Sequence, residues 1–107
     1  MNADYYDCSY VEELINTEIR VNVIVSKEGV LKTCWFINKD GSETLEKASF
    51  IPLTSASSVS MNTYLIEGRR QYRLHVTSPH MPVMSIDELS KDYAYKVFSA
   101  CLALILK

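Results

Sequence analysis

The sequence contains little glycine, proline or cysteine. Three residues of each type occur among its 107, which argues against a disordered, fibrous or disulfide-stapled chain. The cysteines, Cys8, Cys34 and Cys101, are odd in number, lie far apart and have apolar or aromatic neighbours, as reduced core cysteines do. We therefore predict one cytoplasmic domain over residues 1–107, with a single core.

Long hydrophobic runs and an excess of basic charge are also absent. The most apolar stretch, residues 97–106, is ten residues long, whereas a membrane-spanning helix needs about 18 or more. The first residues lack the basic start and apolar centre of a secretory signal. The formal net charge of −2 argues against coating nucleic acid or an anionic membrane through bulk charge. We expect no membrane association, and nucleic-acid binding only through a local basic patch.

Alternating apolar residues predict an antiparallel meander. The run from Ile19 to Val25 alternates β-branched residues with Arg20 and Asn22, which is the period of a half-buried strand. Short turns that contain glycine separate it from the runs that follow, as in β-hairpins. The expected strands, about five in number, cover residues 19–25, 30–37, 43–51, 61–66 and 71–77.

The segment 43–51 is ambiguous between strand and helix. Its Glu, Leu, Lys and Ala residues favour a helix. Its position after the Asp40-Gly41 turn and its end at Pro52 favour a strand. We favour the strand.

Two helices are expected at the ends of the chain. Tyr6, Tyr10 and Leu14 fall at helical spacing and predict a short amphipathic helix over 4–15. Ser85 and Glu88 form an S-x-x-E capping box and predict the start of a long C-terminal helix that is apolar on almost all sides. The fold class is therefore α+β, with the C-terminal helix packed on one sheet face. Because one face covers only part of such a helix, the N-terminal helix or a second subunit would cover the rest.

Signatures of catalysis and of metal binding are missing. The three glycines are each explained by a hairpin, so none is spare for a phosphate-binding or nucleophile turn. The two histidines, His75 and His80, have no cysteine or carboxylate close by in the sequence. We expect a protein that is not an enzyme and that has no catalytic residues, no cofactor and no metal site.

The strand around residues 69–75 is the first candidate interaction surface. Strand alternation places Arg69, Arg73 and His75 on one face, with Arg70 and Tyr72 on the other. No carboxylate occurs from residue 69 to residue 86, so the local potential should be positive. The cationic face could meet phosphates or an acidic protein surface, or it could simply be the solvated face of an antiparallel sheet.

The acidic N-terminal segment is the second candidate. Residues 4–18 hold five carboxylates and no Lys or Arg, and the tyrosines Tyr5, Tyr6 and Tyr10 are residues favoured as anchors at protein interfaces. These tyrosines could instead lie over the protein's own core. Segments 4–18 and 69–75 are also opposite in charge and could face each other within one chain or across a dimer.

The leading functional hypothesis is a non-enzymatic protein-binding module, a small adaptor or inhibitor that acts as a monomer or homodimer on a protein partner that the sequence does not identify. One alternative is a nucleic-acid-binding protein that uses the basic strand 69–75, which a steep loss of binding with salt would reveal. Another is a small-ligand-binding domain with a pocket between the sheet and the C-terminal helix, lined by Trp35 or Phe36.

Overall fold

The computed structural model describes residues 6–14 and 16–107. Along these residues seven strands are followed by one helix. The elements are β1 (Tyr6–Leu14), β2 (Thr17–Ser26), β3 (Gly29–Ile37), β4 (Glu43–Pro52), β5 (Ser58–Ile66), β6 (Arg69–Thr77), β7 (Met84–Leu89) and α1 (Lys91–Ile105).

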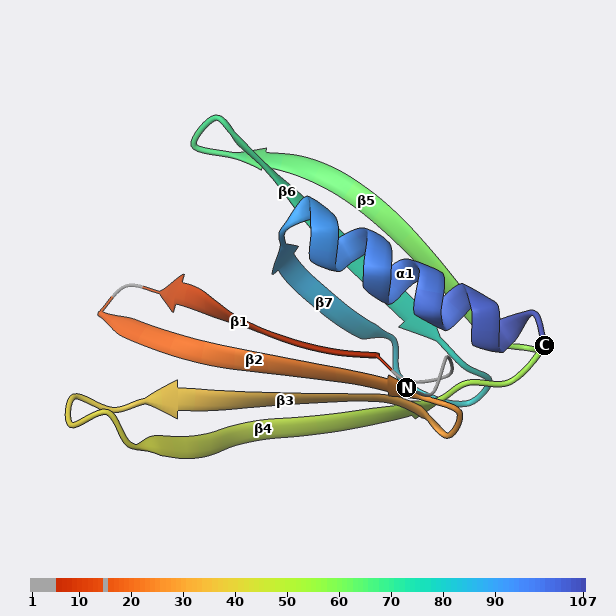
Figure 1. Cartoon of the computed structure of the whole chain (residues 1–107), viewed down its shortest axis with the longest axis horizontal. Coiled ribbons are helices and arrows are strands. Elements are labelled where there is room, and N and C mark those ends of the chain that lie inside the picture. Colours follow the sequence, from red (N-terminus) through yellow and green to blue (C-terminus); the bar gives the residue numbers. More distant parts are fainter. Residues whose placement is uncertain (1–5, 15) are drawn as a thin grey trace.

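The strands form two antiparallel sheets with α1 beside them (Figure 1). The first sheet has the order β1-β2-β3-β4, and the second has the order β5-β6-β7. The α+β class, the antiparallel pairing and the C-terminal helix are confirmed. The single sheet of about five strands is wrong. After Pro52 the chain makes a turn closed by a bond from the Ser57 N–H to the Thr54 carbonyl (3.0 Å), so β5 starts a new sheet.

The predicted N-terminal helix is also wrong in the described residues. β1 pairs with β2 along its whole length, from Tyr6 opposite Val25 to Leu14 opposite Thr17. The spacing of Tyr6 and Tyr10 fits period 2 as well as period 3.6, and pairing with β2 decides between them because it satisfies the backbone of both strands. Residues 4, 5 and 15 of that prediction lie outside the described residues.

The C-terminal helix starts later than predicted. Its N-cap is Ser90, whose Oγ accepts a bond from the Tyr93 N–H (3.3 Å). The predicted capping box at Ser85 and Glu88 lies within β7 instead. Pairing with β6 buries Met84, Ile86 and Leu89, and this burial outweighs the local capping preference. The segment 43–51, by contrast, forms β4 as favoured.

α1 is less enclosed than its composition suggests. One stripe faces the core, with Ala94, Val97, Cys101 and Ile105 buried. On the flank of this stripe Leu102 is 37% exposed. The buried stripe packs mainly on β5 and β6, and it also contacts β1 and β2 of the first sheet. The helix therefore joins the two sheets and does not cover one sheet face alone.

β7 is the second element that joins the sheets. Two of its backbone carbonyls accept bonds from side chains of the first sheet: Tyr10 Oη donates to the Asp87 carbonyl (2.9 Å), and Lys32 Nζ donates to the Ser85 carbonyl (2.8 Å). Unpaired edge carbonyls would otherwise need water or another strand. The core lies between the inward face of the first sheet, β7 and α1.

Candidate interaction surfaces

The outward face of the first sheet is largely apolar over β2, β3 and β4, while β1 adds Asp7, Ser9 and Val11 beside it. Val21, Val23 and Val25 of β2 are fully buried on the inward face, so the residues between them point away from the core. Paired residues on neighbouring strands share a face, which gives three outward rows across β2, β3 and β4. They are Ile24-Leu31-Phe50, Asn22-Thr33-Ala48 and Arg20-Trp35-Leu45. We call the surface made by these nine residues the Trp35 face.

Trp35 is held in place on this surface by its neighbours. The Arg20 guanidinium carbon lies 5.7 Å from the centre of the Trp35 ring, within the range of a cation–π contact. Arg20 also donates to Glu43 through two nitrogens, with Nε–Oε2 2.9 Å and Nη2–Oε1 2.8 Å, and Trp35 Nε1 donates to Thr33 Oγ1 (3.1 Å). The hydrogen bonds from Arg20 lower the pKa of the Glu43 carboxyl. A tryptophan and an arginine are therefore fixed in one arrangement.

Two other large side chains of the Trp35 face are open to solvent, while Ile24 and Leu31 are partly buried. Leu45 is 50% exposed and Phe50 is 49% exposed. A sheet face that only meets water normally alternates to polar residues, and contiguous apolar patches on a monomer mark interaction sites. β3 and β4 therefore carry large apolar side chains on the outward face, which the fold of one chain leaves without a packing partner.

The basic strand has the alternation expected of it. Tyr72, Leu74 and Val76 are buried, and the Tyr72 ring lies 6.2 Å from that of Tyr95 on α1. Tyr72 is thus a core residue. Arg70, which shares its face near the hairpin tip, donates to Thr63 Oγ1 (2.9 Å).

Arg73 is joined to an acidic residue of its own chain. Its Nε lies 2.6 Å from Asp87 Oδ1, and its guanidinium lies 4.6 Å from the centre of the Tyr64 ring. Ser85 Oγ donates to the same carboxylate oxygen (2.8 Å). His75 is half-buried on this outward face, opposite Ser60 and Ser85. The positive charge of Arg73 is therefore neutralised by Asp87 of β7, a segment that was predicted to be helical.

Asp87 should make stability depend on pH. Partial burial favours its neutral form, but hydrogen bonds from Ser85 and Arg73 outweigh burial, so the pKa of the carboxyl is lowered. A lowered pKa in the folded state contributes stability that is present above the unfolded pKa of about 4 and is lost as the pH falls through the folded pKa. We expect Asp87→Asn to lower the free energy of unfolding at pH 7 and to have a smaller effect near pH 3. Urea denaturation at both pH values measures this, and equal effects at both would contradict it.

Arg69 borders a hollow between the two sheets. The hollow has a volume of about 470 Å³ and is lined by Val11 of β1, by Ile66, Glu67, Arg69 and Gln71 of the β5–β6 hairpin, and by Glu88 of β7. Two carboxylates thus lie beside one guanidinium. Charges of both signs therefore line this hollow.

The N-terminal tyrosines lie over the core and do not project as free anchors. Tyr6 is half-buried against the core, and burial is the main cause that raises the pKa of its hydroxyl to about 12. Tyr10, bonded to the Asp87 carbonyl, has its ring 6.4 Å from that of Tyr93, and burial raises its pKa further. Tyr5 lies outside the described residues. Asp87 links the two predicted surfaces, since its carbonyl meets Tyr10 and its carboxylate meets Arg73.

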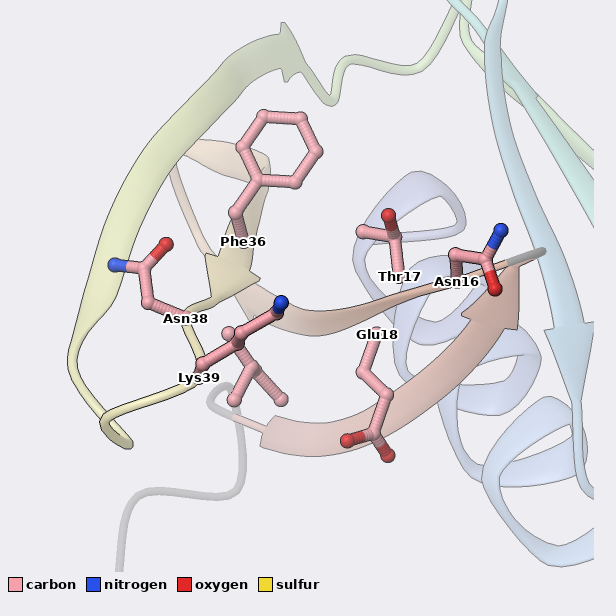
Figure 2. Close-up of a pocket in the computed structure, with 7 residues that line it drawn as sticks. Asn16, Thr17, Glu18, Phe36, Asn38 and Lys39 are labelled. Atoms are coloured by element: carbon pink, nitrogen blue, oxygen red, sulfur yellow. The ribbon is translucent and has the colours of Figure 1, made fainter.

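A larger hollow lies at the far end of the first sheet (Figure 2). It has a volume of about 690 Å³ and is bordered by the β1–β2 turn and the β3–β4 connection. Figure 2 shows Asn16 of the β1–β2 turn with Thr17 and Glu18 at the start of β2, and Phe36 near the end of β3 with Asn38 and Lys39 of the β3–β4 connection. Its lining has no cysteine or histidine and only one carboxylate. Phe36 lines this open hollow, away from the predicted pocket against the helix.

A further hollow of about 550 Å³ does lie at the start of α1. It is bordered by Tyr10 and Val11 of β1, Arg69 to Tyr72 of β6, Glu88 of β7, and Ser90, Lys91 and Tyr93 at the helix start. Trp35 is not among these residues, because it points to the outward face. The ligand-pocket alternative therefore loses the aromatic lining that the sequence suggested for it.

The three cysteines are buried and free. Burial is the main cause that raises the pKa of the Cys8 thiol to about 11 and that of Cys101 to about 12, which keeps both thiols protonated and poorly nucleophilic near neutral pH. Among residues 6–14 and 16–107, no group of three His, Cys, Asp or Glu side chains is placed to hold a metal ion. No helix in the same residues is long and apolar enough to cross a membrane.

Comparisons with protein-family models, with curated proteins and with solved structures return no match to this chain. A function for this protein is therefore inferred from the exposure, charge and contacts of its surface residues.

Proposed function

We propose that this protein is a non-enzymatic protein-binding module of the adaptor or inhibitor type, and that it binds its partner through the Trp35 face. The observation that carries the proposal is the largely apolar, outward surface of β2, β3 and β4, with Leu45 and Phe50 about half exposed and Trp35 between them and Arg20. Such a surface gains free energy when a partner removes it from water.

The composition of the face supports a protein partner. Tryptophan and arginine are enriched among the residues that dominate binding energies at protein interfaces. Arg20 and Trp35 are already held by Glu43 and Thr33, so little side-chain entropy remains to be lost on binding. Because Arg20 is already paired with Glu43, its guanidinium would not be buried in an interface without a counter-charge.

The basic strand supports the nucleic-acid alternative less well. Arg73 would have to leave Asp87 to meet a phosphate, and Tyr72 is too buried to stack on a base. The Arg69 hollow carries Glu67 and Glu88. These contacts favour the protein-binding proposal, because the strongest exposed feature is apolar.

A capture experiment with two matched leucine variants tests the proposal. Leu45 on the Trp35 face and Leu65 at the β5–β6 hairpin are 50% and 62% exposed, so glutamate should be tolerated at both by the fold. We expect Leu45→Glu to lose at least about tenfold of the host protein captured by the wild type, because a carboxylate would be buried without a partner. Leu65→Glu should capture as the wild type does. Quantitative mass spectrometry of proteins retained from the native host measures both, and equal capture by the two variants would reject the Trp35 face.

A further inference from the structure

We infer that two copies of this chain pair through β5 and join their three-stranded sheets into one six-stranded sheet, about a twofold axis perpendicular to the sheet. β5 is an edge strand: in the part of the chain that the structure describes, its only hydrogen-bonded neighbour is β6. An edge strand presents a row of unpaired backbone N–H and C=O groups that a second strand can satisfy. The inference goes beyond the proposed function, because β5 and the Trp35 face belong to different sheets.

β5 is the edge strand with the least protection against pairing. Its nine residues include no charged residue, no proline and no glycine, and all of them pair with β6 without a register shift. Edge strands are usually protected by charges, proline, bulges or cover from another element. The other described edges have such protection. β1 carries three carboxylates, β4 shifts its register and ends in Pro52, and β7 shifts its register and is bonded by Tyr10 and Lys32.

α1 presents an apolar flank on the side of the β5 edge. Tyr95, Leu102 and the C-cap residue Leu106 are exposed on this flank. Leu102 lies nine residues after Tyr93, which is about two and a half helical turns, so the two side chains are on opposite sides of α1. Tyr93 contacts Tyr10 of the first sheet. The exposed flank therefore points away from the first sheet and toward β5.

The position of α1 on the second sheet fits the separation of two packed helices. α1 packs mainly on β5 and β6, so its axis runs above the space between these strands. Neighbouring strands are about 4.8 Å apart, so pairing β5 with β5 of a second copy sets the two helix axes roughly 10 Å apart. Packed helices have axes about 8–10 Å apart. Both helices lie on the same face of the joined sheet, because a twofold axis perpendicular to a sheet preserves its faces.

The strand register brings together apolar side chains that one chain leaves exposed. Pairing of all nine residues of β5 with the second copy puts Asn62 on the axis and Val59 opposite Leu65. Leu65 is exposed because the β5–β6 hairpin extends beyond the start of α1 (Figure 1). α1 runs against the direction of β5 and ends beside the start of that strand (Figure 1). Leu65 of one copy therefore lies close to Leu102 and Leu106 of the other.

The same axis also relates the two helices symmetrically. The Tyr95 ring lies 6.2 Å from that of Tyr72, and Tyr72 is opposite Thr63, the residue after Asn62. One strand residue corresponds to about two helix residues in length. An axis through Asn62 thus crosses α1 about two residues after Tyr95, close to the midpoint between Tyr95 and Leu102. Tyr95 of one helix then packs beside Leu102 of the other, as an isologous contact requires.

The size of this contact predicts a weak dimer. β5 is about 30 Å long and α1 about 22 Å, and each layer is about 10 Å thick. Each copy therefore contributes roughly 500 Å², or roughly 1,000 Å² in total, which lies at the low end for specific interfaces. We expect a dissociation constant on the order of 10 μM.

Sedimentation equilibrium and hydrogen exchange of the unmodified protein test the dimer and its location. We expect a dimer at about 500 μM and a monomer below about 1 μM. Backbone amides of β5 should exchange more slowly at the higher concentration, while those of the edge strand β4 should not change. A monomer throughout this range would overturn the second copy and leave the β5 edge to an extended segment of another protein. A dimer with unchanged β5 exchange would overturn the inference as well.

Glutamate at Leu65 tests the side-chain contacts. We expect Leu65→Glu to weaken self-association at least about tenfold, because its carboxylate would be buried against Val59 and Leu102 of the second copy. The matched variant Leu45→Glu, on the Trp35 face, should dimerise as the wild type does. Both positions are exposed in one chain, so both variants should fold, and circular dichroism checks this. Equal self-association of the two variants would contradict pairing through β5.

Opposite charges at Asn62 test the axis. Asn62 meets Asn62 of the second copy in this register, and it is exposed in one chain. Asn62→Asp and Asn62→Lys should each weaken self-association at least about fivefold, because like charges directly opposite on paired strands are destabilising. An equimolar mixture should form a heterodimer that is tighter than either homodimer. A mixture that associates no better than the separate variants would overturn the axis.

The outcomes separate this inference from the proposed function. If the wild type stays monomeric while Leu45→Glu loses a captured host protein, the second copy is wrong and the Trp35 face stands as the docking surface. If the wild type dimerises through β5 while Leu45→Glu and Leu65→Glu capture the same proteins, the dimer stands and the docking of a partner on the Trp35 face is wrong.

Discussion

Replacing Gly29 by alanine should lower the free energy of unfolding by about 3 kcal/mol or more. Gly29 has a φ of +153°, and an added Cβ would lie 2.2 Å from the backbone oxygen of Ile51 and 2.8 Å from the Phe50 ring. The backbone atom cannot move aside without breaking the pairing of β3 with β4. Because small domains are stable by only about 5–15 kcal/mol, this one methyl group should remove a large part of the total. Urea denaturation followed by circular dichroism measures the loss.

Gly41→Ala provides the matched control. Gly41 also has a positive φ, +88°, but nothing lies within 4 Å of the position of an added Cβ. This substitution should therefore cost only the backbone strain of about 1–2 kcal/mol. Equal losses for the two variants would show that the close approach of β4 to Gly29 has no energetic weight.

Truncating Leu74 to alanine should destabilise the protein by about 3–4 kcal/mol, through lost burial and the cavity left behind. Leu74 lies in the middle of β6, is fully buried and faces the core shared with α1. A loss of this size should lower the melting temperature by roughly 15 °C or more in a domain of about 100 residues. Leu65→Ala, at a position 62% exposed on the neighbouring strand, should change it by no more than a few degrees. Calorimetry compares the two, and similar shifts would mean that the core does not include β6.

The parts of the fold that could be predicted are those in which local pattern and tertiary pairing agree. The β-branched run of β2 and the Tyr72-Leu74-Val76 alternation of β6 identify both the strands and their buried faces. In β1 the apolar spacing fits both a strand, with period 2, and a helix, with period 3.6. The segment forms a strand because it can pair with the edge of β2. In β7 the capping box of Ser85 and Glu88 is overridden by the burial of Ile86 and Leu89. This burial depends on packing against distant parts of the chain, which the local sequence does not indicate.

The Trp35 face was not predicted, although the sequence pattern of β3 indicates it. In β3 both alternating sets contain apolar residues: Val30 and Cys34 face the core on either side of Lys32, while Leu31 and Trp35 face outward on either side of Thr33. A strand that is apolar on both faces needs cover on both sides. Local charge and tyrosine content predict an interface at residues 4–18 and 69–75 and a pocket at Trp35, whereas the exposed apolar face belongs to β2, β3 and β4. Arg73 could not be matched with Asp87 from sequence alone, because that pairing depends on the bend of β7 beside β6.

The arrangement in which α1 and β7 bridge both sheets has a consequence for how the protein is made. A ribosome delivers β1 to β4 first, and this meander already has its hydrogen bonds but cannot yet cover Val21, Val23 and Val25. The segments that bury them, β7 and α1, are synthesised after all the other strands. The growing chain therefore presents a finished but uncovered valine surface on one side and the Trp35 face on the other. During synthesis such a two-sided sheet is exposed to premature association, and the β4 edge, which is charged and shifts its register with β3 between Cys34 and Trp35, protects one of its two edges.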